Sequence, residues 1–112
     1  MKISNKQLVT FINTTNGMVN KTLPLKLSFA LKRNRQLADD AVKPYNEEIA
    51  KIAQTYKDDI QKANELVNQL LKEYINLEIK TVTMDVIDKT EEDGFDALTL
   101  GELEAIDFMI ED

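Results

Sequence analysis

The chain contains no cysteine, no histidine and no tryptophan among its 112 residues. Without cysteine it forms no disulfide, thiol nucleophile, zinc finger or iron–sulfur cluster. Without histidine it lacks the commonest general base near neutral pH and the commonest metal ligand. Glycine and proline are scarce, at three and two residues, which argues against a collagen-like chain, a flexible linker or a many-stranded β protein. We therefore expect a protein without catalytic activity and without a cofactor.

Long hydrophobic runs are absent as well. No apolar stretch approaches the roughly 20 residues of a membrane-spanning helix, and Met1–Ser4 leads into a polar–apolar pattern without the apolar core of a signal peptide. We therefore expect a cytoplasmic protein with no membrane partner. Since 43 % of its residues are hydrophobic and 30 % are charged, the chain can bury one modest core, and residues 1–112 are predicted to form a single helical domain.

Charge is distributed unevenly along the chain. Residues 1–38 carry seven basic side chains and no acidic one, whereas residues 85–112 carry eleven acidic side chains and one lysine. Such polarity points to a partner of opposite charge, to docking of one end on the other, or to a solvated surface. The acidic candidates for partner binding are Asp85, Asp88, Glu91, Glu92, Asp93 and Asp96.

A basic cluster in the first third of the chain is the second candidate site. It comprises Lys26, Lys32, Arg33 and Arg35, which could contact an anionic partner or the acidic end of the same or another copy. Arginine presents a planar fork of donors that suits carboxylate or phosphate. However, helical pitch scatters these side chains, and the net charge of −6 argues against nucleic acid. We expect a protein partner, which includes a further copy of the chain.

Two capping boxes mark helix starts near opposite ends of the chain. A hydroxyl residue precedes Gln or Glu by three positions in each box, and the pairs are Ser4 with Gln7 and Thr99 with Glu102. In such a pair, the side chain of each residue accepts a hydrogen bond from the backbone N–H of the other. Apolar residues beside both boxes are spaced as hydrophobic staples. The first helix should end by Gly17, where β-branched residues give way to a turn. The last should run from Leu100 toward the end of the chain.

An apolar stripe at helical spacing runs from Leu27 to Tyr74. Pro44 removes one donor and predicts a kink, because the stripe keeps its phase on both sides. Residues 57–59 break the stripe, and the helix that follows should pack back as a hairpin. The predicted fold is mostly α, at roughly 60–70 % helix. The predicted core consists of Leu27, Leu31, Ile49, Ile52, Leu66, Leu70 and Ile106.

Residues 77–83 are rich in β-branched side chains and roughly alternate between apolar and polar, which predicts a short strand or an extended segment. A lone strand cannot satisfy its own backbone, so we expect pairing with residues 20–23 or with another chain. Residues 85–96 are interpreted as an acidic connection between elements.

The acidic connection fails the test for a calcium-binding loop. When Gly94 is placed at the sixth position, Lys89 occupies the first ligand position and Leu100 the twelfth, where oxygen ligands are needed. The nearby carboxylates could hold a divalent ion weakly, but a solvated loop is the favoured interpretation. Glycine-rich phosphate loops are absent, and the paired acids are sequence neighbours that diverge on a helix. We predict no metal site and no catalytic residue.

Two segments carry a family resemblance. Residues 23–34 (LPLKLSFALKRN) open a helix with a Leu-Pro pair, and residues 98–111 (LTLGELEAIDFMIE) close the chain. Together with Lys2–Ser4 they resemble a family of short proteins from tailed bacteriophages of Gram-positive bacteria, many of them without assigned function. Residues 57–61 depart from that pattern by being shorter. The resemblance implies a phage setting and a mostly helical fold, and it implies no catalytic residue.

These observations favour a phage-type interaction protein that binds and modulates a protein partner. One candidate partner is a host nucleic-acid-binding effector such as a defence nuclease, whose basic channel could accept carboxylates in place of phosphates. The alternative is a virion structural or assembly component, such as a neck, tail or chaperone-like subunit, which predicts a homo-oligomer with one long apolar seam. The expected location is the cytoplasm of the infected host cell, or the virion in the alternative.

Overall fold

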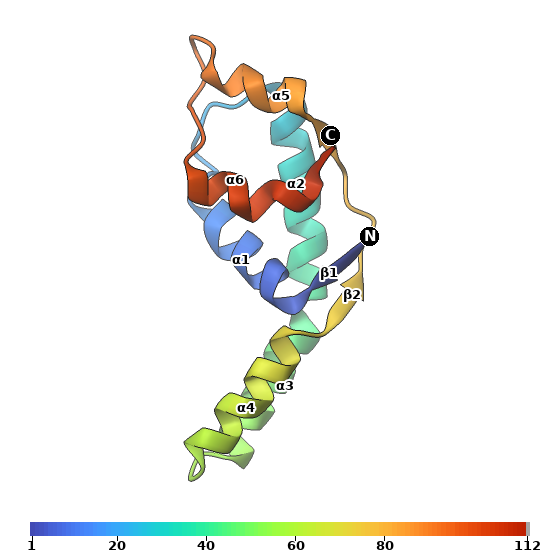
Figure 1. Cartoon of the computed structure of the whole chain (residues 1–112), viewed down its shortest axis with the longest axis vertical. Helices are drawn as coiled ribbons and strands as arrows, with labels where there is room; N and C mark the ends of the chain where they lie inside the picture. The colour runs from blue at the N-terminus through green and yellow to red at the C-terminus, as the bar shows by residue number, and fades with distance from the viewer. Residues whose placement is uncertain (112) are drawn as a thin grey trace.

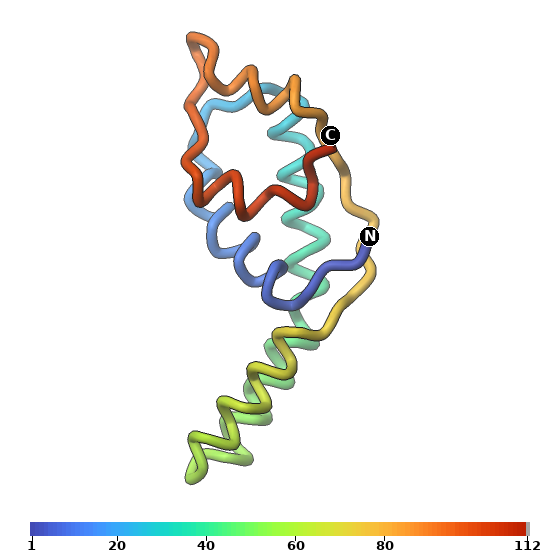
Figure 2. The backbone as a smooth tube through the Cα atoms, in the orientation of Figure 1, coloured from blue at the N-terminus to red at the C-terminus, as the bar shows by residue number. Residues whose placement is uncertain are grey.

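Helices make up 65 % of the protein, as a computed structural model that describes residues 1–111 shows. The prediction of a mostly helical fold is confirmed. The molecule measures 54 × 23 × 20 Å along its principal axes, because a pair of helices projects from one end (Figure 1). Figure 2 follows the backbone and shows that the first and last parts of the chain lie around the same half of the long helix.

Both predicted capping boxes are present at the helices they were expected to start. α1 spans Asn5–Asn16 and ends at Gly17, and α6 spans Leu100–Ile106. The Ser4 hydroxyl accepts from the Gln7 N–H at 3.1 Å, and Gln7 Oε1 accepts from the Ser4 N–H at 2.9 Å. The second box repeats this exchange at 3.1 and 2.8 Å. These caps satisfy N–H groups that an α-helix leaves free at its start.

The predicted kinked helix is confirmed. α2, Leu25–Ala41, and α3, Lys43–Thr55, form one 31-residue helix that is bent by 38°. Pro24 precedes the first turn of α2, and Pro44 lies in the first turn of α3. A proline there lacks the N–H that would complete the helix ladder, so the two segments meet at an angle.

The helix after the break forms a hairpin with α3, as predicted. α4 spans Ile60–Leu71, and the Asp59 side chain caps it by accepting from the Lys62 N–H at 3.1 Å. The predicted core is confirmed at four positions, which are Leu27, Leu31, Ile52 and Ile106. It is wrong at Ile49, Leu66 and Leu70, which are only half-buried, because α3 and α4 project from the core and cover each other from one side only (Figure 1).

The strands are shorter than predicted and pair with different segments. β1, Lys2–Ser4, pairs antiparallel with β2, Tyr74–Asn76. β3, Val82–Thr83, pairs parallel with β4, Ile110–Glu111. Of the expected strand or extended segment over 77–83, Val82 and Thr83 form a strand, and residues 77–81 belong to no strand or helix. The expected pairing with 20–23 is wrong, and the apolar stripe leaves the helix before Tyr74. β2 and β3 thus each pair with a segment near one end of the chain.

Leu77 exchanges backbone hydrogen bonds with Met1 at 2.9 and 3.1 Å, whereas Lys80 is held by a side chain in place of a neighbouring strand. Asn34, fully buried on α2, donates through Nδ2 to the carbonyl of Lys80 at 2.8 Å and accepts through Oδ1 from the Lys80 N–H at 2.8 Å. Its Nδ2 also lies 3.5 Å from Met109 Sδ. One primary amide therefore reproduces the two hydrogen bonds that a paired strand residue would make.

Residues 84–91 contain helix where a connection is predicted, and the last helix of the chain is shorter than predicted. α5, Met84–Asp88, and the 3₁₀ turn η1, Lys89–Glu91, occupy residues interpreted as a connection. Val86 and Ile87 are buried there, which explains the helix. The final helix ends at Ile106 and continues as a 3₁₀ turn, η2, over Asp107–Met109.

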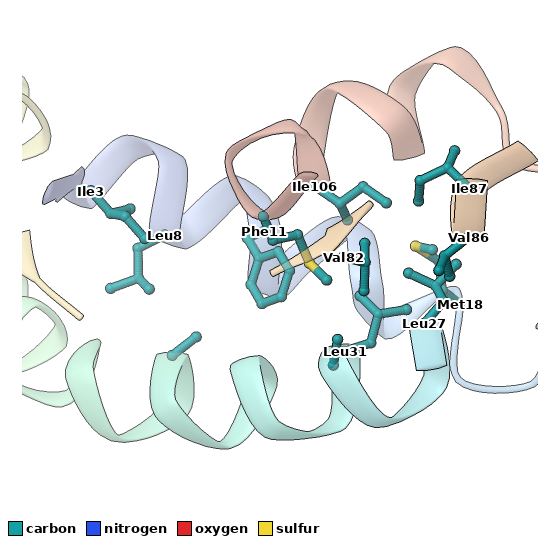
Figure 3. Close-up of a cluster of buried hydrophobic side chains, with 13 residues drawn as sticks. Ile3, Leu8, Phe11, Met18, Leu27, Leu31, Val82, Val86, Ile87 and Ile106 are labelled. Carbon is teal, nitrogen blue, oxygen red and sulfur yellow. The ribbon is translucent and has the colours of Figure 1, made fainter. Parts of the chain in front are cut away.

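The core is built where α1, α2, α5 and α6 meet. Figure 3 shows side chains of α1 and α2 gathered with Val82, Val86 and Ile106. Phe11 meets Phe108 edge to face, with ring centroids 5.1 Å apart, a geometry that aromatic pairs prefer. The basic first part and the acidic last part of the chain therefore pack together through apolar contacts.

Replacing Asn34 with alanine is expected to lower the free energy of unfolding by about 2 kcal/mol or more, since two backbone groups of Lys80 lose partners. Urea denaturation measures this change. Asn46→Ala on the exposed side of α3 is the control: it makes the same gain in helix propensity and should change stability by about 0.5 kcal/mol or less. Equal effects of the two substitutions would contradict the role of Asn34.

Candidate functional site

The acidic segment, residues 85–96, lies at the end of the molecule opposite the hairpin tip (Figure 1). Its six predicted binding carboxylates are all exposed: Asp85, Asp88, Glu91, Glu92, Asp93 and Asp96. Between them, Val86, Ile87 and Thr90 are buried, and the Thr90 hydroxyl donates to the Ile87 carbonyl at 2.8 Å. The carboxylates therefore project from a backbone that is anchored to the core.

The far end of the acidic segment is tied to the loop between α1 and α2. The Asp96 N–H donates to the Thr22 carbonyl at 2.8 Å, and Asp96 Oδ2 accepts from the Thr22 N–H at 2.7 Å. Gly94 turns the chain just before, with a φ of 92° that favours glycine. Asp96 is thus placed as a structural residue, and it leaves the other five acids as the free part of the segment.

One ion pair joins the basic first part of the chain to the acidic last part. Lys21 Nζ donates to Glu102 Oε1 at 2.7 Å and to the Ala97 carbonyl at 2.9 Å. Burial by itself would raise the pKa of Glu102, but the hydrogen bond from Lys21, those from Thr99 and the lysine charge together hold that pKa below its ordinary value. Sequence reasoning missed this pair, although Glu102 was already marked by its capping box.

The four basic candidates do not form one patch. Arg35 donates to Thr15 Oγ1 at 2.6 Å and to Asn16 Oδ1 at 2.7 Å, so its guanidinium fastens α2 to α1. It lines a pocket of about 210 Å³ together with Lys32 and Lys21. Lys26 instead lines a different pocket, and Arg33 lines neither pocket and is exposed.

Within residues 1–111, no ion pair connects the six acidic candidates with the four basic ones. The two ion pairs there are Lys21 with Glu102 and the exposed pair of Lys43 with Asp40. Docking of the acidic end on the same chain therefore uses Lys21 and Thr22, not the predicted basic cluster.

A second surface lies between the helices of the hairpin. A groove runs along α3 and α4, and its apolar lining consists of Ile52, Tyr56, Leu66 and Leu70. Three charged residues also line it, namely Glu48, Lys51 and Glu73. None of the residues of α4, all of which the structure describes, is fully buried, so the apolar side of this helix is only partly covered.

The described part of the chain offers no arrangement for metal binding: no three acidic side chains of residues 1–111 converge closely enough to hold an ion. None of the helices described is both long and apolar enough to cross a membrane. What the acidic segment can supply is a set of hydrogen-bond acceptors with negative charge, which suits lysine and arginine side chains of another molecule.

Comparison of the chain with protein-family models, with curated proteins and with solved structures finds no match. The resemblance to short phage proteins therefore stays a prediction.

Replacing Glu102 with glutamine is expected to make the free energy of unfolding depend less on pH below about pH 5. Because folding lowers the pKa of this carboxyl, its contribution is present above the ordinary value of 4.5 and is lost as the pH falls through the lower folded pKa. Above pH 5, Glu102→Gln should lower the free energy of unfolding by about 1 kcal/mol.

Chemical denaturation between pH 3 and pH 7 measures this dependence. Glu104→Gln, at an exposed position of the same helix, is the control and should keep the wild-type profile. A wild-type slope in the Glu102→Gln variant would show that the pair with Lys21 adds nothing to stability.

Proposed function

We propose that the protein is a non-enzymatic interaction protein that binds a basic protein surface through its acidic segment. The observation that carries this proposal is the anchored row of exposed carboxylates over residues 85–93. Five acidic side chains and one lysine occupy this stretch, so its local charge is strongly negative. A basic channel that normally holds nucleic-acid phosphates is a surface of matching charge.

The backbone of the acidic segment is anchored at both ends, which supports a role in binding and not only as a solvated surface. The buried side chains of α5 hold one end of the segment, and the paired bonds between Asp96 and Thr22 hold the other. A segment that is already ordered loses less conformational entropy when a partner binds. The carboxylates can therefore meet a basic surface without first folding the loop.

Freedom from intramolecular pairing is the second support. Of the six candidates, the five other than Asp96 make no side-chain hydrogen bond or ion pair within the described residues. Their negative charge is then available for long-range attraction, which mainly raises the rate of association.

In the leading form of this proposal, the partner is a nucleic-acid-binding effector of the infected host, such as a defence nuclease, and binding blocks its channel. The proposed location is then the host cytoplasm. The support is the chemistry of the segment, since carboxylates and phosphates are both bound by the planar fork of arginine.

Neutralising Glu91, Glu92 and Asp93 to Gln, Gln and Asn is expected to slow association with the partner at least about tenfold. Folding should be unchanged, because exposed charges without partners contribute little stability. The partner is first captured from host lysate with the tagged wild-type chain, and association rates are then measured at low and at physiological salt.

The matched control removes the same charge elsewhere, by Asp39→Asn, Glu47→Gln and Glu78→Gln at exposed positions. It should associate nearly as fast as the wild type. If both triple variants slow association equally, net charge and not the acidic segment drives binding. If neither does, the acidic segment is a solvated surface and the proposal fails.

The virion component remains the second candidate function, and one observation favours it. The partly covered groove of the hairpin is the type of apolar surface that subunits of an assembly bury. Mass spectrometry of purified virions separates the two functions, since an assembly component is present in stoichiometric amounts and an inhibitor of a host protein is not.

A further inference from the structure

The hairpin groove has an occupant that the charge pattern identifies. The groove is lined by residues of the hairpin, which projects from the end of the molecule away from the acidic segment (Figure 1), so its use is independent of the function proposed above. We infer that it binds the same groove of a second copy of this chain, with the two hairpins antiparallel.

Apolar side chains supply the centre of this interface. Ile52 of α3 and Tyr56, which directly follows that helix, line the groove together with Leu66 and Leu70 of α4, and the α4 pair is half-buried within one chain. A second hairpin laid over the groove would turn a two-helix arrangement into a four-helix bundle, in which each helix gains a further neighbour. Burying Tyr56, Leu66 and Leu70, which are only half-buried within one chain, is the driving force.

Charges at the two ends of the groove select the orientation. Lys62, Leu66 and Gln69 follow one another at helical spacing and therefore lie along one side of α4, and Glu73 follows two residues after the end of this helix. Three of the four line the groove, and Lys62 extends this row toward the hairpin tip. The row is thus basic at the tip, apolar in the middle and acidic at the base.

A twofold axis matches such a row to itself. When two copies lie antiparallel, Lys62 of each copy faces Glu73 of the other, whereas a parallel arrangement would oppose like charges. In the middle of the groove, Glu48 and Lys51 stand one turn apart on α3, so their opposite charges offset each other across the axis. The surface is therefore complementary to a second copy in the antiparallel orientation.

A charge-reversal pair tests the arrangement in the full-length protein. Lys62→Glu and Glu73→Lys, each alone, should raise the dissociation constant of the dimer at least about tenfold, because two symmetric contacts become repulsive. The double variant should restore the wild-type constant, since it exchanges the two charges. Within one chain, Lys62 lies about 13 Å along the helix from the last residue of α4, Leu71, and Glu73 lies beyond that end, so this rescue cannot arise inside one hairpin.

Analytical ultracentrifugation over a range of protein concentrations measures the dissociation constants, and circular dichroism verifies that each variant keeps its helix content. Lys32→Glu, an exposed position outside the hairpin, makes the same charge change as Lys62→Glu and should leave the dimer intact. Neutralising the acidic segment should also leave it intact, which separates this inference from the function proposed above.

A wild-type chain that stays monomeric at every concentration would overturn the inference and would leave the groove to a helix of another protein. A dimer that neither single reversal weakens, or that the double variant does not restore, would overturn it as well, because the two hairpins would then not lie antiparallel over the groove.

Discussion

The amide of Asn34 fixes how the second half of the chain lies on the first. The chain leaves the core along the long helix, turns at the hairpin tip and returns past α2 with residues 77–81. Leu77 bonds to the backbone of Met1, and the residues that follow it up to 81 belong to neither sheet. Asn34 holds both backbone groups of Lys80. Because a buried N–H or carbonyl without a partner is costly, these two bonds determine where the returning segment crosses α2. β3 and α5 follow this segment directly in the chain, so the point where they start depends on that crossing.

The loop between α1 and α2 has the same importance for the acidic segment. Lys21 and Thr22 are neighbours in the sequence, and between them they bind Asp96, Ala97 and Glu102. Together these hydrogen bonds hold the acidic segment and the start of α6 at one place on the surface. The strong separation of charge along the sequence is thus used in part to join its two ends, and the excess negative charge of the acidic segment remains facing solvent.

Local patterns predicted the helices well, because their evidence lies within a few residues. Capping boxes at Ser4 and Thr99, the proline at 44 and the break before Asp59 each act through neighbouring backbone. The strands could not be predicted in this way, since each one pairs with a segment far away in the sequence. Burial of the hairpin was overestimated for a similar reason. An amphipathic pattern shows that a helix has an apolar side, but not whether a further element covers it.

For the candidate site, charge counting located the acidic segment but not the contacts that hold it. Glu102 and Asp96 look alike as sequence, as two acids in an acidic region, yet both are used internally. The basic cluster was less informative, because Arg35 is occupied by Thr15 and Asn16. Which charges are free depends on distances between segments that lie some 75 residues apart in the chain.

Two hydrogen bonds from Asn5 to the base of the hairpin limit how far the hairpin can unfold by itself. Its Nδ2 donates to the Leu70 carbonyl and its N–H to the Glu73 carbonyl, each at 2.9 Å, so the base of α4 is fastened to the core while its tip is not. Amide hydrogens in such a molecule should exchange in two tiers, because a helix pair with little buried surface opens without disturbing the rest. Local unfolding should begin at the hairpin tip near Asp59 and stop at the contacts of Asn5. Asn5 therefore marks the boundary between the hairpin, which opens locally, and the core, which unfolds only as a whole.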